Sequence, residues 1–224
     1  MYAVKILKVE KVTHNVKRFV VEKPKGYKFL PGQATEVAIN LPGWEEKKRP
    51  FTFTSLNSDK FLEFTIKGYP LKEYPNHTGV TEKLHQLKAG DEILIDEPWD
   101  TISYKGKGVF IAGGAGITPF IAIFKSLEKK NELKGNTLIF SNKTSRDVIL
   151  KPQLEKWFDK KSLILTLTKE HKKGFAEGRI DRKFLEKKIK NFKQNFYICG
   201  PKEMKNDISK VLEELDVKPQ SITF

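Results

Sequence analysis

The spacing of apolar residues changes near residue 108, and this change constrains the fold more than any other feature of the sequence. Before it, alternating or β-branched runs are separated by turn-forming Gly, Pro, Asn and Asp residues. Regularly punctuated short strands predict an antiparallel β-barrel. A short amphipathic helix is expected at about residues 79–87. The strands are expected at residues 4–12, 16–22, 35–39, 51–55, 61–66 and 92–95.

After residue 108, strand-like and helix-like segments alternate. This order is typical of a parallel sheet with helical crossovers. The sequence therefore predicts two domains, a barrel at residues 1–103 and an α/β domain at 108–224. Strands are expected near 108–112, 137–140, 163–168 and 196–199, and helices at 119–129, 154–158, 182–189 and 204–215.

The single cysteine, Cys199, limits the redox chemistry that is available to the chain. It excludes an internal disulfide and disfavours a cysteine-ligated cluster, so redox chemistry would need an organic cofactor. The four histidines have no metal-ligand spacing, and no metal site is expected. No apolar run reaches the ~20 residues of a membrane span, and no signal-peptide pattern precedes the first strand. A cytoplasmic protein without membrane contact is expected.

The net charge of +14 is concentrated in the second half of the sequence. Residues 1–100 carry 16 basic and 14 acidic side chains, whereas residues 101–224 carry 26 and 14. Such a surface attracts nucleic acid, phosphorylated ligands or an acidic protein. A generally lysine-rich, solvated surface explains it equally well.

The segment GGAGITP, at residues 113–119, directly follows a predicted strand. Its glycines allow close backbone approach to a phosphate, Thr118 suits a helix N-cap, and Pro119 suits the first helical position. A phosphate site at the helix start is therefore favoured over a bare tight turn. The usual dinucleotide fingerprint is incomplete, because the third glycine is missing and Ser141–Asn142 stand where an acidic residue is expected.

Two further motifs mark other strands. In RPFTFTS, at residues 49–55, alternation would place Arg49 on the same face as Phe51, with Thr52 on the other. An arginine, an aromatic ring and hydroxyls suit a flat, phosphorylated ligand, although a strand with core Phe residues explains the pattern too. Cys199–Gly200–Pro201 end the last predicted strand, where ligands of open α/β sheets bind.

Together, in this order and spacing, the three motifs resemble the ferredoxin–NADP reductase family, and most closely its stand-alone flavodoxin or ferredoxin reductase-like members. The resemblance covers essentially the whole chain. It implies an antiparallel flavin-binding barrel followed by a parallel-sheet domain for a nicotinamide nucleotide.

The resemblance also implies roles on the flavin side. Arg49 would contact the flavin pyrophosphate, Phe51 would pack along the ring system, and Thr52 would hydrogen-bond near the reactive N5. The family's Arg-x-Tyr-Ser pattern is altered at Phe51, which lacks the phenol hydroxyl, and at Thr52, which keeps a hydroxyl. A pyrophosphate site favours FAD over FMN. Other residues implied in flavin binding are Pro50, Ile66, Lys67, Gly79, Val80 and Thr81.

On the nucleotide side, Thr118 would lie near the pyrophosphate or nicotinamide of NAD(P)H, and Cys199 would lie beside the hydride path without acting as a nucleophile. Residues 168–170, Thr-Lys-Glu, resemble a Ser-Arg-Glu segment that clasps the 2′-phosphate of NADP, although solvated loop residues explain them as well. Phe224 could cover the flavin face. Other implied contacts are Gly114, Gly116, Pro119, Gly200 and Pro201.

The resemblance implies an oxidoreductase that passes a hydride from NAD(P)H to FAD N5 and then electrons to an acidic carrier such as flavodoxin or ferredoxin. Two alternatives stay open. One is a diaphorase or flavin reductase with a small-molecule acceptor. The other is a basic nucleic-acid-binding protein, which is disfavoured because the barrel half carries little net charge.

Overall fold

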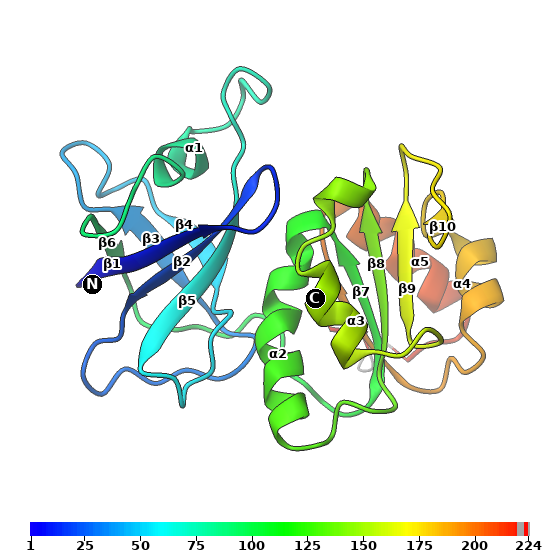
Figure 1. Ribbon diagram of the computed structural model, residues 1–224. Helices are drawn as coiled ribbons and strands as arrows, with labels where there is room; N and C mark the ends of the chain where they lie inside the picture. The colour runs from blue at the N-terminus through cyan, green and yellow to red at the C-terminus, as the bar shows by residue number, and fades with distance from the viewer. Residues whose placement is uncertain (219–221, 224) are drawn as a thin grey trace.

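The computed structural model describes residues 1–218 and 222–223 of the 224-residue chain, and it contains two six-stranded sheets. Each sheet lies in its own half of the chain, with helix α2 between them (Figure 1). The expected architecture, an antiparallel barrel followed by a parallel α/β sheet, is confirmed. Within the described residues no helix is long and apolar enough to cross a membrane.

The first sheet is antiparallel and has the strand order β4-β3-β6-β1-β2-β5. Its two edge strands meet at a bridge between Phe53 and Phe64, so the barrel is nearly closed. Both rings are fully buried in the barrel core, onto which helix α1 packs Val80 and Leu84. The elements are β1 (Tyr2–Lys11), β2 (Val16–Glu22), β3 (Ala34–Ile39), β4 (Arg49–Thr52), β5 (Phe61–Lys67), α1 (Val80–Leu84) and β6 (Glu92–Ile95).

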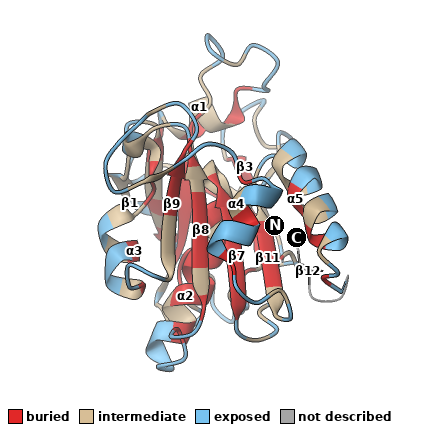
Figure 2. Cartoon of the chain, turned by 90° about the vertical axis from the view of Figure 1, so that its right-hand side faces the viewer, coloured by how far each residue is buried: buried red, intermediate tan, exposed pale blue. Residues whose placement is uncertain are grey.

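The second sheet is parallel and has the order β10-β9-β8-β7-β11-β12. Helices α2 and α3 cover one face and α4 and α5 the other, so the central strands are almost wholly buried (Figure 2). The short edge strands β10 and β12 and two 3-10 turns were not expected from the sequence. The elements are β7 (Gly108–Gly113), η1 (Gly114–Ile117), α2 (Thr118–Lys129), β8 (Thr137–Asn142), η2 (Ser145–Asp147), α3 (Lys151–Trp157), β9 (Leu163–Leu167), β10 (Ala176–Glu177), α4 (Arg182–Lys188), β11 (Asn195–Cys199), α5 (Lys202–Glu214) and β12 (Ile222–Thr223).

The strand order of the second sheet creates a crevice beside β7. The chain moves from β7 to β8 and β9 on one side, and then returns to β11 on the other side of β7. Ligands in open α/β sheets bind outside the carboxyl ends of the strands at such a reversal. The topology therefore predicts a binding crevice between the end of β7 and the end of β11.

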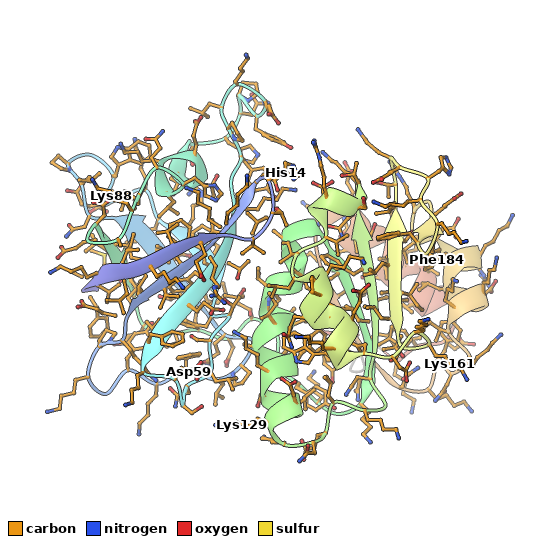
Figure 3. The ribbon with its side chains drawn as sticks, in the orientation of Figure 1. His14, Asp59, Lys88, Lys129, Lys161 and Phe184 are labelled. Atoms are coloured by element: carbon orange, nitrogen blue, oxygen red, sulfur yellow. The ribbon has the colours of Figure 1, made fainter. Side chains whose placement is uncertain are left out.

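One face of helix α2 contacts the barrel and holds the second domain against it. The Lys125 ammonium lies 3.0 Å from the buried Glu63 carboxylate of β5, and Lys129 Nζ donates to Ser58 Oγ at 3.2 Å. These two lysines follow Thr118 by about two and three helical turns, which places all three residues on the same side of the helix. Figure 3 shows Lys129 near the barrel turn that carries Asp59. The start of α2 is thus held in register with the barrel strands.

Candidate functional site

A cleft of about 860 Å³ lies between the barrel and the carboxyl edge of the parallel sheet. A volume of this size is typical of cofactor and substrate sites. Most of the residues predicted for cofactor binding lie together in its lining: Pro50, Phe51, Thr52, Ile66, Lys67, Thr81, Gly114, Gly116, Thr118, Pro119, Cys199, Gly200 and Pro201.

Three predicted residues are not part of this lining. Arg49 and Gly79 lie beside the cleft without belonging to its lining, and Val80 points into the barrel core, where 2% of it is exposed. Only the backbone of Val80 is therefore available to a ligand. Phe224 lies outside the described residues.

Part of the nucleotide-domain wall of the cleft is a glycine-rich turn. A Cβ on Gly116 would lie 2.2 Å from the Cys199 carbonyl oxygen, and one on Gly113 would lie 2.5 Å from Met204 Sδ. These glycines let the turn after β7 pack directly against the end of β11. Such close packing leaves the turn's backbone amides near the crevice, where a pyrophosphate could approach them.

The prediction that Thr118 caps helix α2 is wrong. Residues 114–117 form the 3-10 turn η1, which runs into α2, so Thr118 is the first residue of that helix and its hydroxyl caps nothing. Instead, Thr52 Oγ1 of the barrel donates to Thr118 Oγ1 at 2.8 Å. This hydrogen bond joins the two walls of the cleft. Pro119 occupies the first helical turn, as its fixed φ angle favours.

Strand β4 also departs from its predicted alternation. The strand ends at Thr52, and three consecutive residues, Pro50, Phe51 and Thr52, all line the cleft. β4 is a four-residue strand at the edge of the sheet, so the alternation expected over residues 49–55 does not continue beyond Thr52. Phe53, which was expected to share a face with Phe51, is buried in the barrel core.

The end of strand β5 supplies Ile66 and Lys67. The half-buried His85 imidazole lies with Nε2 2.9 Å from the Ile66 carbonyl oxygen, so Nε2 carries the proton and donates it. Burial lowers the pKa of His85, which keeps the ring neutral. Burial also lowers the pKa of Lys67, against the opposing charge of Asp147. An anionic ligand beside Lys67 would favour the charged form of its ammonium group and so oppose the effect of burial.

Arg49 is held beside the start of α1. Its guanidinium donates to the Lys48 carbonyl at 2.7 Å and to Thr78 Oγ1 at 2.8 Å. Gly79 follows Thr78 with a positive φ of 77°, which turns the chain into the helix. Thr81, one residue into α1, accepts from the Tyr69 amide at 3.2 Å. This corner therefore combines a cation with the hydroxyls of Thr78 and Thr81, which suit a phosphate group.

Cys199 lies at the carboxyl end of β11 in the cleft lining. Burial raises the pKa of its thiol to about 11, although the nearby Lys205 opposes the shift. The thiol is therefore protonated at neutral pH, and a protonated thiol is a poor nucleophile. This chemistry fits a residue that packs against a ligand rather than one that attacks it.

Sequence reasoning missed several residues of the lining. An aromatic cluster in the loop between β5 and α1 brings the Tyr69 ring 5.1 Å from Tyr74 and 4.9 Å from His77, measured between ring centroids. Three aromatic residues within nine positions of a glycine-flanked loop were a signal that could have been used. Asp147 and Met204 carry no comparable sequence signal. The other unpredicted residues are Thr65, Ser141, Asn142 and Lys143, whereas Gly113, Ala115 and Thr168 belong to segments that the sequence singled out.

The two halves of this cleft match known domain families. The family described as "Oxidoreductase FAD-binding domain" matches residues 3–104, and the one described as "Oxidoreductase NAD-binding domain" matches residues 110–210. The chain belongs to the ferredoxin–NADP reductase family. FAD and a nicotinamide nucleotide are accordingly the cofactors of its two domains.

Two curated relatives of this reductase-family chain are each 28% identical to it over the aligned residues. NADH-cytochrome b5 reductase 2 of Mycosarcoma maydis aligns with 86% of the chain, and the flavohemoprotein of Bacillus subtilis (strain 168) aligns with 98%. The chain spans only 59% and 57% of the lengths of these two relatives.

Solved structures of the ferredoxin–NADP reductase family share the fold. The flavohem-like FAD/NAD-binding domain of nitric oxide dioxygenase from Vibrio cholerae O1 biovar El Tor is 20% identical, with a TM-score of 0.85 over 99% of this chain and 96% of that one. A ferredoxin NADP+ reductase from Neisseria gonorrhoeae, solved with bound FAD and NADP, is 21% identical, with a TM-score of 0.81 over 96% and 91%.

The cleft residues fit both cofactors of this reductase fold. On the barrel side, the Phe51 ring and the Thr52 hydroxyl suit a flat ring system with polar edges, and Arg49 suits its phosphates. On the other side, Gly113 and Gly116 let the turn after β7 pack against the end of β11, and both glycines lie in the lining of the cleft. Within the described residues no group of three or more His, Cys, Asp or Glu side chains could hold a metal ion.

Proposed function

We propose that this chain is an NAD(P)H-dependent flavoprotein oxidoreductase. One observation carries the proposal: the flavin-side wall and the nucleotide-side wall meet at the Thr52–Thr118 hydrogen bond, inside one cleft. Two flat cofactors held by these walls would face each other at this junction. A hydride donor and its acceptor need this arrangement more than they need an acid or a base.

The chain's own residues would bind, orient and exclude water. When FAD is bound, it supplies the chemistry by accepting a hydride at N5 and releasing electrons one at a time. Thr52 would hydrogen-bond near that position, and Phe51 would pack along the ring. The neutral Cys199 thiol would limit how the nicotinamide lies in its pocket. No side chain needs to gain or lose a proton in the transfer.

FAD is favoured over FMN by features at two places on the barrel. Arg49 and the start of α1 offer a site for a pyrophosphate, which FMN lacks. The loop cluster of Tyr69, Tyr74 and His77 lines the same cleft and offers ring faces for an adenine. An apoprotein titration comparing FAD with FMN would test this choice.

The proposed acceptor is an acidic one-electron carrier. The second half of the chain carries 26 basic and 14 acidic side chains, and complementary charge raises association rates. Flavodoxin and ferredoxin are carriers of this class. Cytochrome b5 is a third carrier to test, because one of the curated relatives is an NADH-cytochrome b5 reductase. A small-molecule acceptor is the second candidate, because an uncovered flavin edge reduces quinones without any docking surface. A cytoplasmic location stays a prediction from the sequence.

The visible spectrum of the purified protein tests the proposal. Under anaerobic conditions, the flavin absorbance should bleach when NADPH or NADH is added, and the faster nucleotide identifies the preferred coenzyme. A protein that stays colourless after incubation with FAD and FMN would contradict the proposal.

Salt dependence separates the two classes of acceptor. The bleached protein is mixed with flavodoxin, ferredoxin or cytochrome b5, and in parallel with a neutral quinone, over a range of ionic strengths. Transfer to an acidic carrier should slow steeply as salt screens the surface charges, whereas transfer to the quinone should not. Rapid transfer to the quinone only would favour the small-molecule acceptor.

A further inference from the structure

The side chain of Asn142 is a buried polar group without a partner. Asn142 ends strand β8 and lies in the lining of the cleft, with 5% of its surface exposed. In the described part of the chain, neither its amide nitrogen nor its amide oxygen has a hydrogen-bond partner. Most buried polar side chains are hydrogen-bonded, so an exception beside a cleft calls for a ligand.

The backbone carbonyl of Asn142 accepts two hydrogen bonds, which fix the residue in place. Its carbonyl oxygen accepts from the Thr168 amide at 2.9 Å and from Thr168 Oγ1 at 3.4 Å. Asn142 also pairs with Leu167 of β9 in the sheet register. The carboxamide is therefore held by a rigid strand end while its two polar atoms stay unpaired.

The position of β8 indicates which part of a ligand reaches this amide. The nicotinamide end of a dinucleotide would lie where β7 meets β11, beside Cys199 and the Thr52–Thr118 hydrogen bond. Strands in a sheet are about 4.8 Å apart, so β8 ends about 10 Å from β11, on the far side of β7. A dinucleotide that extends over β8 would present its pyrophosphate and adenosine ribose there.

The surroundings of Asn142 suit these groups. Ser141 and Thr168 contribute hydroxyls, and Lys143 contributes a positive charge, to the same part of the lining. Among the described residues of the lining the carboxylate is Asp147, which accepts hydrogen bonds from the Thr144 amide at 2.8 Å and the Thr144 hydroxyl at 2.5 Å. Phosphate oxygens need donors and ribose hydroxyls offer them, so a carboxamide can serve both.

We propose that the Asn142 carboxamide binds the adenosine-diphosphate half of the nicotinamide dinucleotide. Its N–H group would donate to a pyrophosphate oxygen, and its oxygen would accept from a ribose hydroxyl. This inference rests on the proposed function, because it assumes that NAD(P)H occupies the cleft. Asn142 is then a binding residue on the nucleotide side that becomes hydrogen-bonded only when the coenzyme is bound.

A matched pair of variants tests this role without a catalytic assay. Asn136 is also buried, but its amide donates to the Leu133 carbonyl at 3.0 Å and accepts from the Gly108 amide at 3.1 Å. Replacing a satisfied amide by an apolar side chain should lower Tm, whereas replacing an unsatisfied one should not. In protein loaded with flavin but free of nucleotide, we therefore expect Asn136→Leu to lower Tm and Asn142→Leu to keep or raise it.

Calorimetric titration with ADP-ribose, which contains the adenosine-diphosphate half but no nicotinamide, supplies the second measurement. Asn142→Ala and Asn142→Leu should weaken ADP-ribose binding about tenfold or more, because a hydrogen bond to a charged group is lost. Binding of reduced nicotinamide mononucleotide, which lacks that half, should weaken less. Unchanged ADP-ribose affinity, or a Tm loss in Asn142→Leu equal to that in Asn136→Leu, would overturn the inference.

The two proposals fail in different ways. If the wild-type flavin is not bleached by NADPH or NADH, the proposed function is wrong, whatever the variants bind. If the wild-type flavin is bleached and Asn142→Ala binds ADP-ribose as tightly as the wild type, only the role of Asn142 is wrong.

Discussion

The barrel wall of the cleft presents side chains to its contents, whereas the glycine-rich turn after β7 in the opposite wall presents backbone. On the barrel, Phe51, Thr52 and Lys67 reach the cleft with a ring, a hydroxyl and an ammonium group. On the second domain, Gly113 and Gly116 have no room for a Cβ. The side-chain contacts on the barrel can be altered one at a time by substitution. The glycine turn depends on close packing against β11, which a single added methyl group would disrupt.

Gly116→Ala should have the largest effect. The new Cβ would overlap the backbone at Cys199 and Gly200, which cannot move without parting η1 from β11. We expect a loss of about 3 kcal/mol or more in the free energy of unfolding, or failure to fold, since overpacking a rigid site typically costs 1–3 kcal/mol. Denaturant unfolding followed by circular dichroism measures it.

Gly114→Ala is the control in the same turn. Gly114 has a φ of 52°, but nothing lies within 4 Å of its would-be Cβ. The substitution should therefore cost only the left-handed strain of about 1–2 kcal/mol. An equal loss in both variants would contradict the close approach of η1 to β11.

Lys125→Met should have the next largest effect, because it removes the contacts of the Lys125 ammonium on α2 with Glu63 and the Thr54 carbonyl of the barrel. It would leave the Glu63 carboxylate with a hydrogen bond from Thr54 and a more distant Arg18 at 3.7 Å. Removing one partner of a fully buried pair costs about 3–5 kcal/mol, but 28% of the Lys125 side chain is exposed, so about 2 kcal/mol is expected.

The exposed ion pair of Lys151 and Glu155 provides the control for the contact between Lys125 and Glu63. Lys151→Met should cost no more than about 0.5 kcal/mol, as is usual for an exposed helical pair. If Lys125→Met and Lys151→Met lose the same stability, the Glu63 contact does not hold α2 on the barrel.

Arg49→Ala should weaken FAD retention while leaving the fold intact. One charged hydrogen bond is worth about 1.5–3 kcal/mol, which corresponds to roughly a 10- to 100-fold rise in the Kd for FAD. Equilibrium dialysis or flavin fluorescence measures this Kd. Arg182→Ala, on the exposed helix α4, is the control, and full flavin content in purified Arg49→Ala would count against the pyrophosphate role.

The smallest effect is expected at Cys199, where the two walls meet the nicotinamide pocket. Cys199→Ala should slow flavin reduction by NAD(P)H more than it weakens flavin binding. The pKa of the thiol is raised to about 11, so the reduction rate should not change with thiol ionisation between pH 6 and 9.

The same pKa shift affects the stability of the fold. Because the folded pKa lies above the ordinary value of 9.0, the stability contributed by Cys199 is present below pH 9 and declines as pH rises toward 11. A wild-type inflection near pH 8.5 that Cys199→Ala abolishes would contradict the neutral thiol.

The same contrast explains what the sequence could predict. Residues 113–119 and 199–201 follow apolar strands, so their place at the carboxyl edge of the sheet follows from the chain alone. The contact between Lys125 and Glu63 joins residues 62 positions apart, and it depends on how α2 packs against the barrel. The unpaired amide of Asn142 becomes visible only when its neighbours are placed.

The errors also have local causes. A threonine before a proline normally caps a helix, but at Thr118 the preceding 3-10 turn had already started the helical path. The alternation expected through Phe53 assumed a strand that continues, whereas β4 ends at Thr52.

The most direct test of the central claim uses NADPH or NADH labelled with deuterium on one face of the nicotinamide C4 at a time. Stopped-flow bleaching of the flavin is followed with each labelled form and with the unlabelled coenzyme. A cleft that holds the nicotinamide against the flavin in one orientation predicts slower bleaching with one labelled face and unchanged bleaching with the other. Equal rates with both labelled forms and the unlabelled coenzyme, while hydride transfer limits bleaching, would contradict direct transfer across the Thr52–Thr118 junction.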